Sequence, residues 1–353
     1  MKQSLRLILV ACAGFAALAF AAPALASYNP SLTIEQTSYK LGAGTTADTF
    51  IATDPSDDPT AKLTIRVPAG YGINLAQTPG TKIGSVFAIV KANALSGALL
   101  PLSGDVVVAN GTDPSIVTAS QQCTGRPANQ ATWVLKASLQ GQTVSIPVFV
   151  NKAAGALSAA LEVCLPPPQT ATLGAQLVAA DFTASGVFTN PSASNGYEWS
   201  GIFTPYAAGT TVPNVAGTVE WRTYVGLPSS LTFKRVKSRT GLKFGGVLRV
   251  TGVSPKGIKL RLYYAKKPNP APNAVRGSAK GAKVARTAGL PSSGKYSIKR
   301  PSVKAKTYFQ MRFENYLLDT CSPPSLAPQG CKGEDIAALT SGQVRVLPPR
   351  RRR

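Results

Sequence analysis

The chain has 353 residues, of which 38 are lysine or arginine and 15 are aspartate or glutamate, so its formal net charge is +23. It has no histidine, which excludes Ser-His-Asp and Cys-His catalytic sites and zinc or iron held by histidine. Its 32 glycines and 28 prolines favour many short strands joined by turns over long helices.

Residues 1–26 have the pattern of a cleavable signal peptide. Lys2 and Arg6 precede an apolar stretch, and Ala24-Leu25-Ala26 supplies the small residues of a cleavage site. An alternative is a lipoprotein leader with lipidation at Cys12, but it leaves an apolar region below the roughly 7 residues such leaders need. No later run is long and apolar enough to span a bilayer. We therefore expect a secreted, extracellular protein, with cell-wall association or a lipid anchor as alternatives.

Residues 27–226 are predicted to be strands throughout and to form a near-neutral β-sandwich domain. Residues 61–67 alternate polar and apolar side chains, as in a sheet with one wet face. Residues 132–137 and 143–150 flank Gly141, which predicts a hairpin. Pro147 cannot donate a ladder hydrogen bond, so we expect it at an edge or a bulge.

Two acidic features of this region have a functional and a structural interpretation. The Asp54–Pro59 loop is rich in aspartate and suggests Ca²⁺, but its spacing matches no known calcium loop, and a solvated turn is favoured. Glu198 and Glu220 lie among aromatic residues, as in a carbohydrate site with two carboxylates. Two ordinary strands with rings in the core and carboxylates in water have the same pattern, and this interpretation is favoured.

The charge changes abruptly along the chain, and we place a domain boundary with it. Residues 222–353 hold 28 lysines and arginines against four acidic residues, a net charge of +24. Val225–Ser230 is the predicted linker, and 227–349 is predicted to be a basic immunoglobulin-like β-sandwich of about seven strands, with a mobile loop near 267–281. Residues 350–353 form an arginine tail.

A resemblance supports this architecture. It is carried by Leu231–Phe233, Gly245–Gly252, Ile258–Leu262, Ser293–Ile298 and Lys306–Arg312. In this order they resemble the GG-x-V-x-L-x-G, V-x-L, G-x-Y-x-F and T-x-Y-R strands of Ig-like repeats in secreted and surface proteins of actinobacteria. The resemblance covers the last third of the chain and implies a fold and a location only.

The front half also resembles secreted actinobacterial proteins of uncharacterised function. The residues concerned are Val67–Gly72 and Gly196–Trp199, and they imply no activity. The long proline- and asparagine-rich loop and the segment between Cys321 and Cys331 depart from a minimal Ig-like repeat. Together these features predict an all-β protein of two β-sandwich domains, the second Ig-like, after a cleaved signal peptide.

Four cysteines follow the signal peptide: Cys123, Cys164, Cys321 and Cys331. An even number in an exported chain indicates disulfides, for which three connectivities exist. Cys123–Cys164 and Cys321–Cys331 are expected, because each closes a loop within one domain. The spacings contain no C-x-x-C step and histidine is absent, so no metal site and no cofactor are expected.

The basic residues of the second domain are candidates for binding a polyanion, such as an anionic cell-wall polymer. Lys259 and Arg261 alternate with apolar residues and should both face outward from one strand. Lys243 and Lys295 lie in the same basic clusters. The alternative is a generically basic, solvated surface. The candidates are Lys234, Arg235, Lys237, Lys259, Arg261, Lys266, Lys267, Lys299, Arg300, Arg350, Arg351, Arg352 and Arg353.

No catalytic residue is predicted. Ser292-Ser293-Gly294-Lys295 matches the S-x-x-K nucleophile motif, but it leads into a strand and is read as a hairpin turn. We expect a non-enzymatic protein of the cell envelope whose basic domain binds anionic envelope polymers. The alternatives are a secreted carbohydrate-active enzyme or glycan-binding protein that uses the first domain, and a purely structural or partner-binding module. No specific nucleic-acid motif is present, and the sequence does not predict an oligomeric state.

Overall fold

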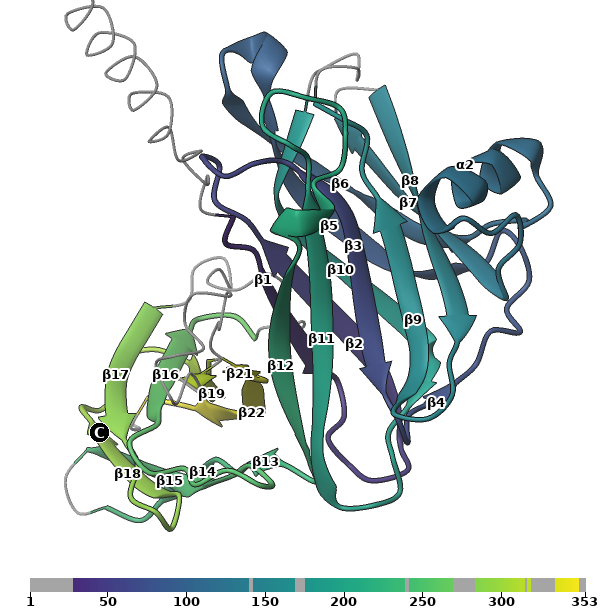
Figure 1. Ribbon diagram of the computed structural model, residues 1–353. Coiled ribbons are helices and arrows are strands. Elements are labelled where there is room, and N and C mark those ends of the chain that lie inside the picture. Colours follow the sequence, from purple (N-terminus) through teal and green to yellow (C-terminus); the bar gives the residue numbers. More distant parts are fainter. Residues whose placement is uncertain are drawn as a thin grey trace, which may run out of the picture.

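The computed structural model describes residues 28–348, apart from 140–141, 169–174, 239–240, 269–282, 315 and 319–333. The described chain is all-β (Figure 1). The predicted signal peptide with Cys12, the Cys321–Cys331 pair, most of the predicted 267–281 loop and the arginine tail lie outside the described residues. Among the described residues, no helix combines the length and the apolar character needed to cross a membrane.

The first part of the chain is built on one sheet, here called the front sheet, with fourteen described strands in the order β1-β2-β10-β5-β6-β7-β8-β9-β3-β11-β12-β21-β20 and β4 beside β10. Neighbouring strands are antiparallel except β12 and β21, which are parallel. The strands are β1 (Ser31–Gln36), β2 (Gly44–Ala52), β3 (Thr60–Pro68), β4 (Gly72–Ile73), β5 (Lys82–Ala92), β6 (Ala98–Val108), β7 (Ala131–Leu139), β8 (Gln142–Lys152), β9 (Leu157–Cys164), β10 (Ala175–Thr189), β11 (Asn195–Pro205), β12 (Val219–Leu227), β20 (Tyr316–Leu318) and β21 (Glu334–Ile336).

The front sheet curls until β1 lies against β12, so that its two layers enclose one core (Figure 1). On β3 the predicted alternation is confirmed: Leu63, Ile65 and Val67 are buried, and Arg66 is exposed. β7 and β8 form the predicted hairpin. The pairing of β8 with β9 begins at Val148, so Pro147 lies just outside it. On this side Pro147 is at an edge, where its missing N–H costs no ladder hydrogen bond.

The expectation of strands throughout this region is wrong at one place, because Pro114–Thr124 forms the helix α2. Pro114 stands in the first turn, where its fixed φ suits a helix and its absent N–H is not needed. Gly125 ends the helix with φ 70°, and its N–H donates to the carbonyl of Gln121. Two short 3-10 turns, η1 (Asn93–Leu95) and η2 (Val215–Gly217), lie in loops between strands.

The second part of the chain folds into two facing sheets, here called the back sandwich. One has the order β13-β15-β14 with β18 beside β15, and the other has the order β17-β16-β19-β22. Phe244 and Phe309 join the two layers through rings whose centroids are 4.7 Å apart. The strands are β13 (Ser230–Leu231), β14 (Lys234–Val236), β15 (Leu242–Arg249), β16 (Lys259–Ala265), β17 (Lys283–Gly289), β18 (Lys295–Arg300), β19 (Thr307–Phe313) and β22 (Leu339–Val346).

The predicted linker at Val225–Ser230 is not an extended spacer. β12 continues to Leu227, and the side chains of Val225 and Leu227 are fully buried. The late strand β21 pairs with β12, while its Ile336 lies in the core of the back sandwich. Tyr39 packs against both cores, and its hydroxyl donates to the carbonyl of Ala338 over 2.6 Å. The front sheet and the back sandwich are therefore joined by packed and hydrogen-bonded contacts.

Candidate polyanion-binding surface

Four lysines lie on the outer side of the sheet formed by β14, β15 and β18. On β18, Tyr296 and Ile298 are buried and the lysines on either side of them are exposed. On β15, Leu242 and Phe244 are buried, so the residue between them points outward. We call this surface the lysine face, and its members are Lys234, Lys243, Lys295 and Lys299.

The strand register brings these ammonium groups close together. Lys243 stands directly opposite Lys299 across the β15–β18 ladder, and Lys234 and Lys295 follow on the same face. Directly opposed like charges destabilise an antiparallel pair. Within the described part of the chain, none of the four lysines forms an ion pair. The lysine face is thus a concentrated positive field to which no described carboxylate is paired.

Further basic groups lie at the margin of this sheet. Arg235 and Lys237 line a shallow depression together with Ser238 and Gly241. Arg300 sits on the other side of β18, with its guanidinium carbon 5.4 Å from the ring centroid of Tyr264. Arg235 stands opposite buried Phe244 in the β14–β15 register, so it is directed to the other side of β14 from Lys234. Arg300 is likewise directed away from the lysine face.

The predicted pair on β16 belongs to another surface. Lys259 and Arg261 are exposed beside buried Leu260, as the alternation predicts. However, β16 lies in the second sheet of the back sandwich, so its outer side faces away from the lysine face. The guanidinium of Arg261 is also paired with the carboxylate of Glu314 at 2.5 Å.

The remaining candidates are only partly placed. Lys266 and Lys267 are exposed just beyond the end of β16. Arg350 to Arg353 lie outside the described residues. The structure thus gathers Lys234 and Lys299 with Lys243 and Lys295, and it separates them from Lys259 and Arg261. Both Lys243 and Lys295 are visible in the sequence, but only the pairing of β15 with β14 and β18 puts them on one face.

The carboxylates of β11 and β12 lie on the other side of the sheet from the buried rings of β11. Tyr197 and Trp199 are buried in the front core at 8% and 1% exposure. Glu198 and Glu220 lie on the opposite, solvent-facing side, where Arg222 pairs with them at 3.5 and 3.4 Å. For Tyr197, Trp199 and the two glutamates, this is the arrangement that the structural interpretation expected: rings in the core and carboxylates in water.

The aspartates of the Asp54–Pro59 loop accept hydrogen bonds that stabilise the conformation of the loop and of the segment beside it. Asp54 accepts hydrogen bonds from the backbone N–H and the hydroxyl of Ser56 at 2.8 and 2.6 Å, and these bonds lower the pKa of its carboxyl. Asp57 is buried and accepts the backbone N–H of Asn29 at 2.6 Å. In the described ranges, no three acidic or cysteine side chains come together in a way that can hold a metal ion.

The S-x-x-K segment is a turn, but its expected type is wrong. β17 pairs with β16, and β18 pairs with β15, so residues 290–294 connect two different sheets and do not close a hairpin. Lys295 opens β18 as part of the lysine face, and its backbone N–H, rather than its ammonium, is the group near the hydroxyl of Ser293, at 3.5 Å. The segment therefore connects the two sheets of the back sandwich.

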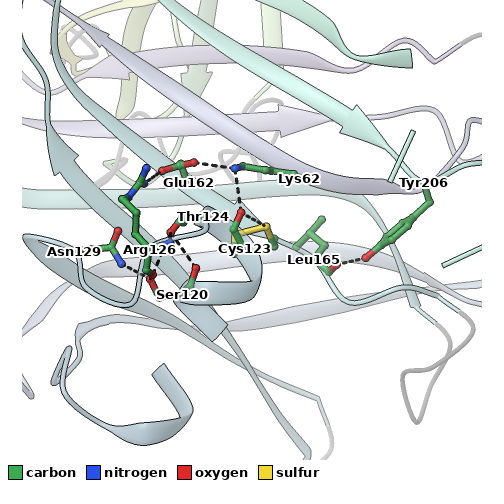
Figure 2. Close-up of a disulfide and its surroundings, with 10 residues drawn as sticks. Lys62, Ser120, Cys123, Thr124, Arg126, Asn129, Glu162, Leu165 and Tyr206 are labelled. Carbon is green, nitrogen blue, oxygen red and sulfur yellow. Dashed lines mark hydrogen bonds and ion pairs between the residues drawn. A yellow bond between two sulfur atoms is a disulfide. The ribbon is translucent and has the colours of Figure 1, made fainter. Parts of the chain in front are cut away.

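A disulfide between Cys123 and Cys164 ties α2 to the end of β9, with an S–S distance of 2.15 Å (Figure 2). Lys62 reinforces this attachment: its ammonium donates to the carbonyl of Cys123 at 3.1 Å and to the Glu162 carboxylate at 2.8 Å. Arg126, just after the helix, pairs with the other oxygen of Glu162. The helix is thereby held on the outside of the sheet by the disulfide, by the hydrogen bond from Lys62 to Cys123 and by the ion pair of Arg126 with Glu162.

Comparisons with known proteins add little to this geometry. No family model matches the sequence, and no curated protein matches it significantly. Among solved structures, the chain is similar to domains D2 and D3 of the major pilin SpaD from Corynebacterium diphtheriae, at 11% identity and a TM-score of 0.24, over 80% of this chain and 81% of that chain. At this TM-score the likeness carries no argument about fold or function, so the all-β architecture rests on the strands and cores described above.

Proposed function

We propose that this is a non-enzymatic, exported protein of the cell envelope that uses its lysine face to bind an anionic polymer. The observation that carries the proposal is the lysine face itself: four outward lysines, two of them directly opposed, with no carboxylate paired to them in the described structure. A surface of this kind attracts an anionic partner and is stabilised by it. Export is supported by the leader pattern of residues 1–26 and by the Cys123–Cys164 disulfide.

The arrangement suits a polymer better than a single small anion. Alternate residues of a strand are about 6.7 Å apart, and neighbouring strands are about 4.8 Å apart, so the lysines form a grid of separate charges. All four lysines lie on the outer side of the sheet, where each ammonium can meet a different unit of a flexible chain. Anionic wall polymers of the teichoic acid type are the expected partners of an exported protein with this surface.

The test uses the purified protein and long-chain inorganic polyphosphate as the probe. We expect salt-dependent binding, with the logarithm of affinity falling linearly with the logarithm of salt concentration. K243Q/K299Q should weaken binding roughly 30-fold at low salt, since each lysine contributes about 1 kcal/mol, and should make the salt slope shallower by roughly two units.

The matched control is K266Q/K267Q. It removes the same number of charges at exposed positions beyond the end of β16, away from the lysine face. Equal losses in the two variants would mean that only the net charge matters and would overturn the assignment to the lysine face. Absence of binding to polyphosphate and to isolated cell walls at 50 mM salt would overturn the function itself.

A further inference from the structure

The front sheet encloses an apolar cavity of about 140 Å³. Its walls come from both layers of the curled sheet, including Leu63 of β3, Phe182 of β10 and Phe203 of β11. Of the described residues in the lining, Thr60 alone is polar, and its hydroxyl lies 2.7 Å from the hydroxyl of Tyr28. The cavity therefore offers apolar contact and almost no hydrogen bonding to whatever occupies it.

Small side chains create this space. Alanines occupy inward positions on strands of both layers, where leucine or valine fills comparable positions elsewhere in the core. They are Ala88, Ala92, Ala137, Ala175 and Ala180. Protein interiors are normally packed as densely as organic crystals, so a void lined by five alanines departs from what stability alone favours. This departure is the first reason to assign the cavity a role.

The cavity reaches the surface at one end. Deep lining residues such as Leu63 and Phe203 are at most 4% exposed. Toward the ends of the strands, the lining residues Val90, Leu100 and Val144 are only partly buried, and Pro166 is exposed. In the described residues, this end of the cavity is therefore the less enclosed one, and we call it the open end.

Exposed apolar side chains surround the same end. Leu95, in the turn from β5 to β6, is 52% exposed, and Leu99, at the start of β6, is 55% exposed. The loop from β11 to β12 carries Val212 and Val215, which are 62% and 77% exposed. Both connections lie at the end of the sheet where Thr60 begins β3, as the strand register requires. Exposed apolar side chains from both connections therefore lie at the open end, beside Lys91, whose ammonium donates to the carbonyl of Pro55.

We propose that this cavity binds the alkyl chain of a small amphiphile, with its polar head in solvent at the open end. The apolar lining excludes a ligand with polar groups along its length, because these would be buried without partners. A dry apolar cavity of about 150 Å³ holds benzene, so this one takes a chain of a few carbons. The site lies in the front sheet and is independent of the lysine face.

The test titrates the protein with hexanoate, octanoate and decanoate, and follows the methyl signals of the cavity alanines by NMR together with calorimetry. We expect saturable shifts at Ala88, Ala137 and Ala180, and no shifts with 1,6-hexanediol, which has a polar group at both ends. Two results would overturn the proposal. One is that 1,6-hexanediol shifts the alanine methyl signals as much as the carboxylates do. The other is that no carboxylate shifts these signals below its micelle-forming concentration.

Two variants locate the ligand. A180L fills the cavity and should reduce octanoate affinity at least tenfold, whereas L102A enlarges it and should move the preference toward decanoate. A153L adds the same side chain at an exposed position of the β8–β9 turn and should leave binding unchanged. If A180L fails to fold, L102A alone provides the test. If L102A binds hexanoate, octanoate and decanoate with the same relative affinities as the unchanged protein, binding inside the sheet is contradicted.

Discussion

Tyr71 shows how a single polar group is accommodated in the front core. Its side chain is 4% exposed, and its hydroxyl accepts a hydrogen bond from the side-chain amide of Gln36 at 2.8 Å. Its ring packs edge-on against Tyr197 and Trp199, with centroids 5.7 and 5.0 Å away. Burial disfavours the phenolate and raises the pKa of Tyr71 to about 12.

This raised pKa predicts a loss of stability in alkali. In the unfolded chain the phenol ionises near pH 10, whereas in the folded chain it stays neutral, so stability is intact below pH 10 and falls as the pH rises toward 12. Y71F should make the free energy of unfolding decline less steeply between these limits, by about 1.4 kcal/mol per pH unit. Urea unfolding at a series of pH values measures the slope.

Y71F should also lower the free energy of unfolding at every pH, because the amide of Gln36 loses its hydrogen-bond acceptor. That loss shifts the plot of unfolding free energy against pH by a constant amount and does not change its slope. Parallel pH curves for Y71F and the wild type would contradict the burial argument. Tyr197 lies in the same aromatic cluster, and Y197F serves as a comparison for the loss of a hydroxyl.

At the scale of elements, α2 depends on contacts outside itself. It has 11 residues, too few for a helix to be stable alone in water, and its cap residue Asp113 makes no side-chain capping bond. Cys123 ties its last turn to β9, and Ser120, its one buried residue, donates a hydrogen bond to the carbonyl of Arg126 at 2.5 Å. The disulfide is therefore the main constraint that keeps the helix on the sheet.

Removing this disulfide should cost several kilocalories. The bond closes a loop with a sequence separation of 41, for which the chain-entropy treatment gives about 4 kcal/mol. C123A/C164A should lower the midpoint of urea unfolding accordingly and increase hydrogen exchange in residues 114–124. R126Q, which loses an exposed ion pair with Glu162, should lower stability by about 1 kcal/mol or less. An equal effect of both changes would argue against the disulfide as the dominant constraint.

At the scale of the whole molecule, β21 links the two cores. Its Asp335 is 4% exposed and accepts the hydroxyl of Thr33 at 2.9 Å, while the N–H of Ala337 donates to the carbonyl of Tyr224 at 2.9 Å. Ile336, between them, is fully buried in the back sandwich. A break in either core therefore disturbs the contacts of the other, and we expect the two to unfold in one transition.

Tryptophan fluorescence provides the test, because Trp133, Trp199 and Trp221 all lie in the first part of the chain. I298A leaves a cavity in the back sandwich and should destabilise it by about 3 kcal/mol. If unfolding is cooperative, the fluorescence transition moves to lower urea by the corresponding amount. An unmoved fluorescence transition, with a second transition seen by circular dichroism, would show that the two parts unfold independently.

The sequence predicts the local features of this molecule better than their assembly. The alternation at residues 61–67 and at Lys259–Arg261 correctly predicts which side chains face outward. The helix α2 has its signals in Pro114 and Gly125, and the expectation of strands throughout overlooked them. These features are local, so neighbouring residues are sufficient to encode them.

Features that depend on strand pairing are not visible in the sequence. The lysine face requires β15 to lie between β14 and β18, and the cavity requires alanines from several distant strands to face one another. The pairing of β12 with β21 joins residues more than a hundred positions apart. Periodicity predicts the side of a strand and does not identify its neighbour.

The pairing of β12 with β21 also affects the order in which the chain can mature. A chain is made from its N-terminus, so the edge of the front sheet at β12 stays without its partner until residues 334–336 have emerged. An unpaired strand edge is a template for pairing with other chains. Chains that lack residues 334–336 should therefore associate with one another through the exposed edge of β12. In the longer chain, β21 pairs with this edge and covers it.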